Sequence, residues 1–154
     1  MIRMTKQADY GIVLLTRMAA EPERLFNATE LAEEAHLPQP TVSKILKILA
    51  REGLLASQRG VKGGYTLDRA PETVSVADVI SALEGPIAIT ECIDETPGLC
   101  SQEAFCPVRG NWHRINDAIR RALSAITLAE MTQPLPRGLV TLGDGEIHRA
   151  AELG

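Results

Sequence analysis

The chain has 154 residues, of which 45% are apolar and 23% are charged, and its formal net charge is −4. This length and apolar content suit one domain with a hydrophobic core, or a small domain with an extension, and argue against a wholly disordered chain. We expect no membrane span, because no run of about 18 uncharged apolar residues occurs, and the odd number of cysteines, three, favours a cytoplasmic protein over a disulfide framework.

Positive charge is concentrated in one short stretch. Residues 39–69 contain six basic and two acidic residues, although the whole chain is acidic. This pattern is typical of a protein in which a single surface meets phosphate groups.

The first third of the chain predicts three helices. Residues 5–20 have helical apolar spacing, and Thr5 can cap their start. Asn27 can cap a second, short helix, ATELAEEAH. A break at residues 36–39 precedes a third helix, PTVSKILKILAREG, which Gly53 ends. Two helices joined by a short break, the second amphipathic and basic, predict a helix-turn-helix.

A predicted β-hairpin follows the third helix. Two β-prone runs, LLASQRG and GGYTLDR, flank a turn rich in glycine, with Arg59 and Lys62 near its tip. A basic hairpin directly after a recognition helix is the wing of a winged helix. Ser75 then caps a fourth predicted helix, VADVISALEG.

The second half predicts an irregular segment and a long helix. Residues 87–90 (IAIT) can form a strand, and a helix of about 19 residues begins near Pro107. Its apolar face consists of Val108, Trp112, Ile115, Ile119, Ala122 and Leu123. Since the winged helix offers this face no obvious partner, we expect it to pack on a second copy of the chain.

These elements predict a mainly α fold with four parts. Residues 1–85 form a winged helix-turn-helix DNA-binding domain, and residues 86–106 form a cysteine-bearing loop, which we call the cysteine loop. Residues 107–131 form a long C-terminal dimerisation helix with a last turn, LAEM, and residues 132–154 form a poorly ordered, flexible tail.

Polar residues at the start of the third helix are candidates for reading base edges in the major groove. They are Gln39, Thr41, Ser43 and Lys44. Lys47 and Arg51 lie further along and suit phosphate contacts, and Arg59 or Lys62 at the wing tip can reach a minor groove. The alternative is a solvated basic face on an ordinary three-helix core.

The three cysteines all lie in the cysteine loop. Cys92, Cys100 and Cys106 are separated by seven and then five residues. Thiolates outside a periodic apolar segment suit a soft metal centre. Their spacing matches no zinc-finger pattern, and an iron–sulfur cluster normally takes a fourth ligand. Reactive redox thiols and coincidence stay open as alternatives.

Several segments of the chain together resemble a known family. The segments that carry the resemblance are MTKQADYGIVLL, HLPQPTVSKILKILAREGLL, SQRGVKGGYTL, VADVISALEGPIAIT and CPVRGNWHRINDAIRRAL, together with the three-cysteine loop. They resemble the IscR/NsrR family of iron–sulfur winged-helix transcription regulators, and within it the regulators of the SUF iron–sulfur assembly system. The resemblance covers about residues 1–132. It implies a homodimeric regulator of promoter DNA, usually a repressor and not an enzyme, with a 2Fe-2S or 4Fe-4S cluster.

The resemblance also implies a ligand set. It places the cluster thiolates on Cys92, Cys100 and Cys106. IscR-type members have a histidine three residues after the last cysteine, where this chain has Arg109. Members that resemble the nitric-oxide sensors use an acidic residue near the N-terminus, which falls on Asp9 and would come from the other subunit. A solvated residue of the first helix is the alternative for this position.

Other functions stay open at this stage. His113, two helical turns beyond the last cysteine, is a second candidate for the fourth ligand, with a helix-surface residue as the alternative. The chain can be a nitric-oxide or redox-sensing repressor of stress genes, or a dimeric DNA-binding protein stabilised by zinc. A redox enzyme or electron carrier is disfavoured, because no glycine-rich phosphate loop, Ser/His/Asp set or second cluster motif is present.

Overall fold

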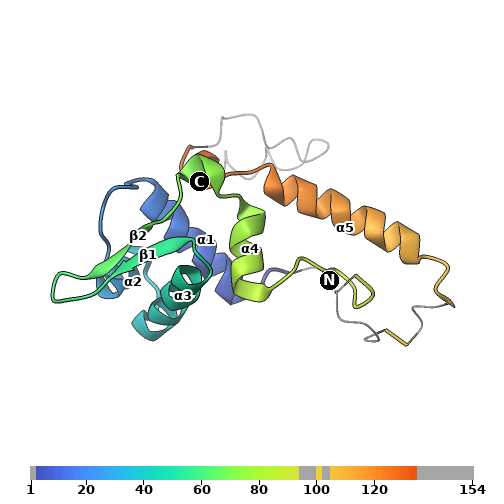
Figure 1. The fold of residues 1–154 in the computed structure, drawn as a ribbon, viewed down its shortest axis with the longest axis horizontal. Coiled ribbons are helices and arrows are strands. Elements are labelled where there is room, and N and C mark those ends of the chain that lie inside the picture. The colour runs from blue at the N-terminus through green and yellow to red at the C-terminus, as the bar shows by residue number, and fades with distance from the viewer. Residues whose placement is uncertain (1–2, 94–99, 102–104, 135–154) are drawn as a thin grey trace, which may run out of the picture.

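The computed structural model describes residues 3–93, 100–101 and 105–134 (Figure 1). Its elements, in chain order, are α1 (Lys6–Ala19), α2 (Ala28–Ala35), α3 (Gln39–Arg51), β1 (Leu55–Gln58), β2 (Gly64–Leu67), the 3-10 turn η1 (Pro71–Thr73), α4 (Val76–Glu84), α5 (Arg109–Ser124) and α6 (Leu128–Met131). No helix in this part of the chain is long and apolar enough to cross a membrane. Most of the predicted tail, from residue 135 onward, lies outside the described residues.

α1, α2 and α4 begin at the caps that the sequence predicts, whereas α3 begins one residue before the predicted Pro40, at Gln39, and α5 begins at Arg109, two residues after Pro107. The Thr5 side chain accepts a hydrogen bond from an N–H of the first turn of α1, and that of Asn27 accepts one from the N–H of Glu30 at 2.8 Å. Ser75 and Asp78 form a reciprocal capping box at the start of α4. Each cap satisfies backbone donors that have no partner inside the helix, which fixes the start of the helix.

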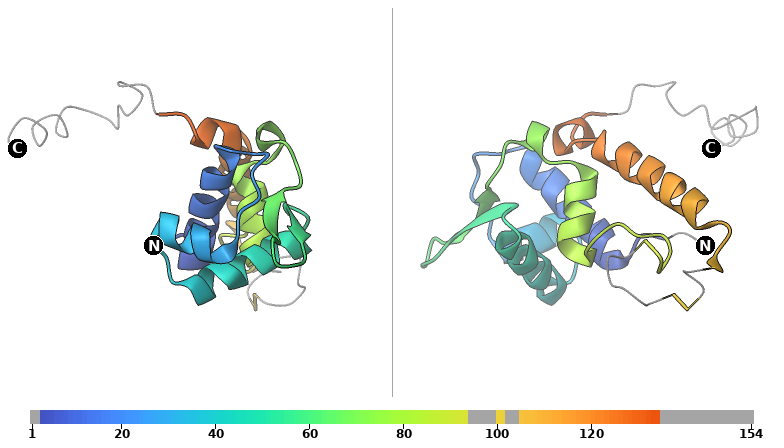
Figure 2. Two further views of the ribbon diagram at one scale, coloured as in Figure 1. Left: turned by 90° about the vertical axis from the view of Figure 1, so that its left-hand side faces the viewer. Right: turned by 45° about the vertical axis from the view of Figure 1, so that its right-hand side comes forward.

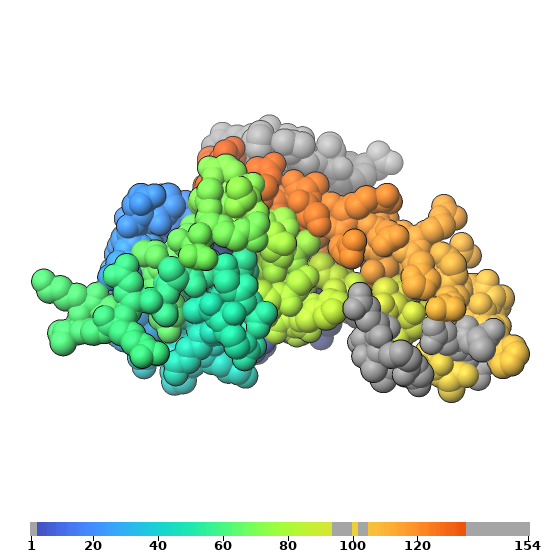
Figure 3. Space-filling model, in the orientation of Figure 1, coloured from blue at the N-terminus to red at the C-terminus, as the bar shows by residue number. Residues whose placement is uncertain are grey.

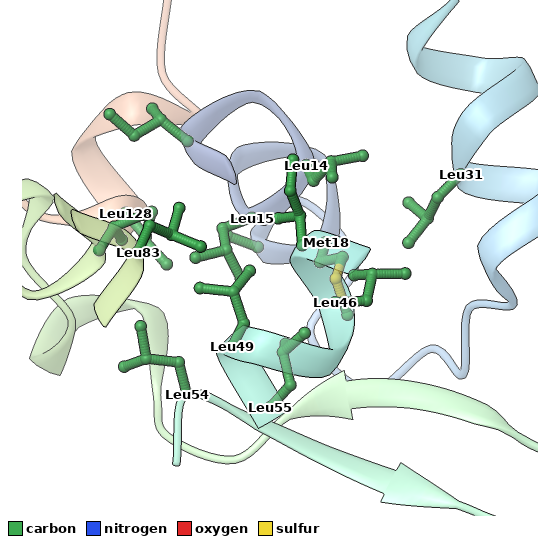
Figure 4. Close-up of a cluster of buried hydrophobic side chains, with 14 of the residues drawn as sticks. Leu14, Leu15, Met18, Leu31, Leu46, Leu49, Leu54, Leu55, Leu83 and Leu128 are labelled. Atoms are coloured by element: carbon green, nitrogen blue, oxygen red, sulfur yellow. The ribbon is translucent and has the colours of Figure 1, made fainter. Parts of the chain in front are cut away.

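One hydrophobic core joins α1, α2, α3, α4, α6 and the first strand of the wing (Figure 4). Among its members are Leu14, Leu15, Met18, Leu31, Leu46, Leu49, Leu54, Leu55, Leu83 and Leu128. Gly11 allows α1 and α4 to pack closely, because a side chain at this position would overlap Leu83. The mainly α winged-helix fold predicted from the sequence is confirmed.

The wing is a two-stranded antiparallel hairpin. Its register pairs Leu55 with Leu67 and Gln58 with Gly64. Gly60 turns the chain at the tip with a φ of 117°, a backbone conformation that favours glycine. The hairpin projects from the helical body, as Figure 1 and the right-hand view of Figure 2 show.

Ion pairs cover the turn between α1 and α2. Arg24 pairs with Glu21 at 3.0 Å and also with Glu30, and its guanidinium lies 4.5 Å from the centre of the buried Phe26 ring. The hydrogen bond from Arg17 holds the pKa of Glu21 below its ordinary value. Because these pairs are partly exposed, they orient the turn more than they stabilise the fold.

Residues 87–90 do not form the predicted strand. Asn116 of α5 instead donates from Nδ2 to the carbonyl of Ile87 at 2.9 Å, and its Oδ1 accepts from the N–H of Ile89 at 3.1 Å. We call these two hydrogen bonds the Asn116 clamp. The backbone groups that a neighbouring strand would have used are paired with a side chain, so this apolar stretch stays irregular.

The end of α5 returns the chain to the core. The N–H of Val76 donates to the carbonyl of Ile126, and the N–H of Leu128 donates to that of Val74, both at 2.9 Å. A capping box at Thr127 starts α6, which is the predicted last turn, LAEM. The other end of α5 extends away from the winged helix, so it lies at the far end of the molecule from the wing (Figures 2 and 3).

We predict that Leu128→Ala lowers the free energy of unfolding by about 2–5 kcal/mol, because its fully buried side chain (0% exposed) would leave a cavity in the core. Urea unfolding followed by circular dichroism measures this change. Met131→Ala is the control, since Met131 lies on the same short helix with 41% of its surface exposed, and its effect should stay within about 0.5 kcal/mol. Equal effects of the two substitutions would show that α6 is not part of the core.

Candidate nucleic-acid interface and cysteine loop

The exposed face of α3 is polar and basic. Its opposite face is buried through Val42, Ile45, Leu46 and Leu49. Thr41 and Ser43 are half-buried, whereas Lys44 and Lys47 are exposed and form no hydrogen bond or ion pair with any residue that the structure describes. Their ammonium groups are free to contact phosphate or a base edge.

Two of the predicted DNA-contacting residues have partners within the chain. Gln39 donates from Nε2 to Oγ1 of Thr29 at 3.3 Å, which joins the first turn of α3 to α2. The Nε of Arg51 lies 3.0 Å from a carboxylate oxygen of Glu52. Because that pair is solvent-exposed, it is weak and does not prevent Arg51 from turning toward phosphate.

Arg59 and Lys62 lie at the tip of the wing. Both side chains are exposed, and neither has a partner among the described residues. β1 packs against α3, so the wing begins beside the recognition helix (Figure 1). The arrangement can place α3 in a major groove and the basic wing tip beside it.

A groove that sequence analysis did not predict lies between α1 and the start of α3. Its volume is about 600 Å³, and residues from both helices line it, among them Lys6, Tyr10, Pro40 and Lys44. Lys6 is exposed and unpaired within the described part of the chain. It extends the basic surface of α3 onto α1. In the sequence, the only feature that points to Lys6 as part of this surface is its positive charge in the first helix.

The structure places the three cysteines between α4 and α5. Cys92, Cys100 and Cys106 are free thiols and half-buried. The Sγ of Cys92 lies 3.3 Å from Oγ1 of Thr90. No three histidine, cysteine or acidic side chains come together as a metal site in the described ranges. The donor chemistry of three thiols fits a soft metal centre, but the structure does not bring them together as a ligand set.

Asp9 is exposed on the first turn of α1. That turn is attached to the end of α4: Gln7 donates to the carbonyl of Leu83 at 2.8 Å, and Thr5 donates to a carboxylate oxygen of Glu84 at 2.5 Å. Since the cysteine loop starts directly after α4, the first turn of α1 lies where the loop leaves the winged helix. His113 is exposed on α5.

The free end of α5 exposes large apolar side chains. Trp112 is 37% exposed and Ile115 43%, although both belong to the apolar face that the sequence predicts. Further along the same face, Leu123 packs against the core. The face is thus covered near the winged helix and open beyond it.

Comparison with known proteins identifies the family. A family model described as "Rrf2: Iron-dependent Transcriptional regulator" matches residues 4–134. Protein rrf2 of Nitratidesulfovibrio vulgaris is 30% identical over 131 residues, which cover 84% of this chain and 87% of the relative. The resemblance to transcription regulators, rather than enzymes, is confirmed.

Solved structures show the same fold. The global cysteine regulator CymR of B. subtilis has a TM-score of 0.67 and 26% identity, and the match covers 86% of this chain and 97% of CymR. IscR of T. potens has a TM-score of 0.68 and 24% identity, with 96% of each chain covered, and supports the fold alone. The chain belongs to the Rrf2 family of transcription regulators.

Proposed function

We propose that the chain is a cytoplasmic, homodimeric repressor of SUF iron–sulfur assembly genes whose DNA binding depends on an iron–sulfur cluster. The observation that carries the proposal is the position of three free thiols in the one segment that joins the winged helix to α5. A change in this segment acts directly on the helix that would hold two subunits together.

Cys92, Cys100 and Cys106 would supply three ligands. Asp9 of a second subunit would supply the fourth, and as a hard oxygen donor it would be displaced more easily than a thiolate. The cluster would supply a centre whose occupancy and oxidation state respond to iron, oxygen or nitric oxide. His113 is the alternative fourth ligand, from the same α5 that follows the cysteine loop.

The winged helix would read DNA through α3 and the wing. In a dimer, each recognition helix meets one half-site, and adjacent half-sites are about 34–36 Å apart along the duplex. The exposed face of α5 at Trp112 and Ile115 is the proposed contact between subunits. Because the spacing of the two α3 helices follows from this contact, a small rotation of α5 changes the fit to both half-sites.

Family membership alone does not identify the genes that the protein regulates, since the family also includes a protein described as a global cysteine regulator. A nitric-oxide or redox-sensing repressor of stress genes would use the same parts, and its neighbouring genes would encode stress enzymes instead of assembly proteins. A zinc-stabilised dimer would be colourless and contain zinc without iron or sulfide.

We predict that replacing Cys92, Cys100 or Cys106 with alanine, one at a time, abolishes the visible absorption of protein reconstituted without oxygen with ferrous iron and sulfide. The fold should be preserved, because none of these thiols belongs to the core. Ser101→Ala, in the same loop, is the control and should keep the absorption. If neither iron nor sulfide binds to the unmodified protein, cluster dependence is wrong.

We predict that Lys44→Ala and Arg59→Ala each weaken operator binding by about 1–3 kcal/mol if the side chain contacts a base, with the metal content unchanged. Fluorescence anisotropy at several salt concentrations measures the effect. Arg120→Ala removes the same charge from α5, far from α3 and the wing, and should leave the affinity nearly unchanged. Full affinity in both test variants would exclude α3 and the wing tip as the DNA-binding surface.

We predict that Ile115→Asp shifts the chain from dimer to monomer, because it places a charge in the proposed apolar contact. Sedimentation velocity over a range of concentrations measures the dissociation constant, which should rise by about 30-fold or more for a central contact residue. Arg114→Asp introduces the same side chain on the polar side of α5 as a control. A dimer that is unaffected by Ile115→Asp would place the interface elsewhere.

A further inference from the structure

Asn116 is a buried polar residue that the DNA-binding and cysteine-loop assignments do not use. Its side chain is 5% exposed, and among the described residues it is the only polar or charged one classed as buried. Burying an amide costs free energy unless its hydrogen bonds are satisfied. The Asn116 clamp satisfies both ends of the amide with backbone groups of residues 27 and 29 positions earlier in the chain.

The clamp brackets the cysteines in the sequence. It holds Ile87 and Ile89, just before Cys92, against a position on α5 ten residues beyond Cys106. All three thiols therefore lie in a stretch of chain whose two ends are joined by one side chain. If the three thiols come together on one ligand, either the chain between the two ends rearranges or the hydrogen bonds of the clamp break.

The clamp also divides α5 into two parts. From Asn116 to its end at Ser124 the helix runs beside α4, and the residues directly after it pair with the backbone of Val74 and Val76. Before Asn116 the helix extends away from the winged helix (Figure 1), and this part of it carries the exposed residues Trp112 and Ile115. Among the described residues, α5 is thus attached to the winged helix by its packing on α4, by the backbone pairing after its end and by the clamp, and the clamp binds two residues of the cysteine loop.

We propose that Asn116 is the positioning residue that couples the state of the cysteine loop to the direction of α5, and through it to DNA binding. This inference rests on the proposed function. The clamp consists of two hydrogen bonds, whose net contribution to stability is modest, whereas the other attachment of α5 includes the fully buried Leu128. A change in the loop would therefore act at the clamp first.

The decisive experiment compares the operator affinities of apo protein and of protein reconstituted with ferrous iron and sulfide, at one salt concentration. In the wild type we expect the two affinities to differ by about 5-fold or more, the lower range of measured allosteric coupling. In Asn116→Ala we expect the difference to fall below about 2-fold, with the visible absorption retained. Asn111→Ala, an exposed residue on the same helix, is the matched control and should keep the wild-type difference.

A second measurement tests the clamp without any metal. In apo protein the amide proton of Ile89 should exchange slowly with solvent, and Asn116→Ala should make it exchange faster, while the core of the winged helix keeps its protection. If Asn116→Ala does not fold, Asn116→Asp serves instead. It keeps the size of the side chain and the acceptor for Ile89, but an ionised carboxylate cannot donate to Ile87.

The outcomes separate the two claims. Equal affinities of the apo and reconstituted wild type would overturn the proposed function and this inference with it. A wild-type difference that persists in a folded Asn116 variant would overturn the inference alone. A difference lost in the Asn116 variant but kept in Asn111→Ala, with faster exchange at Ile89, would support the coupling.

Discussion

The position of α5 depends on hydrogen bonds to the flanks of α4 more than on its own burial. Asn116 is its one buried residue, and it binds the backbone directly after α4. At the other end, residues 126–128 pair with residues 74–76 directly before α4. α4 lies between these attachments: the nine residues of α5 from Asn116 to Ser124 span about 13 Å, the same length as the nine-residue α4.

Local features of the fold follow from the sequence, because their causes are local. Thr5, Asn27, Ser75 and Thr127 each cap a helix within three residues of their own position. The wing follows from β-prone runs on either side of glycines. The strand predicted at residues 87–90 was wrong because its backbone partner is Asn116, a residue whose spacing along the chain gives no sign of that contact.

Some residues of the candidate site could also be predicted from the sequence, and others could not. The basic residues of α3 and the wing could be predicted, since an amphipathic helix shows its charges to solvent. The contribution of Lys6 could not, because it depends on how α1 packs beside the start of α3. Three thiols in one loop indicate the kind of chemistry, but spacing alone does not say whether or how they come together, and the proposed fourth ligand, Asp9, would come from a second subunit.

The proposed regulation requires that one attachment of α5 stay fixed while the other can break. In the proposed mechanism, a ligand of the cysteine loop would shift the DNA-binding equilibrium only by the difference in its affinity for the two conformations. If both attachments of α5 were core contacts, a shift of α5 would cost several kcal/mol per buried side chain lost. With Leu128 fixed in the core and the polar clamp at Asn116, the proposed pivot of α5 about its C-terminal end would cost about the free energy of two hydrogen bonds, within the roughly 1–3 kcal/mol typical of allosteric coupling.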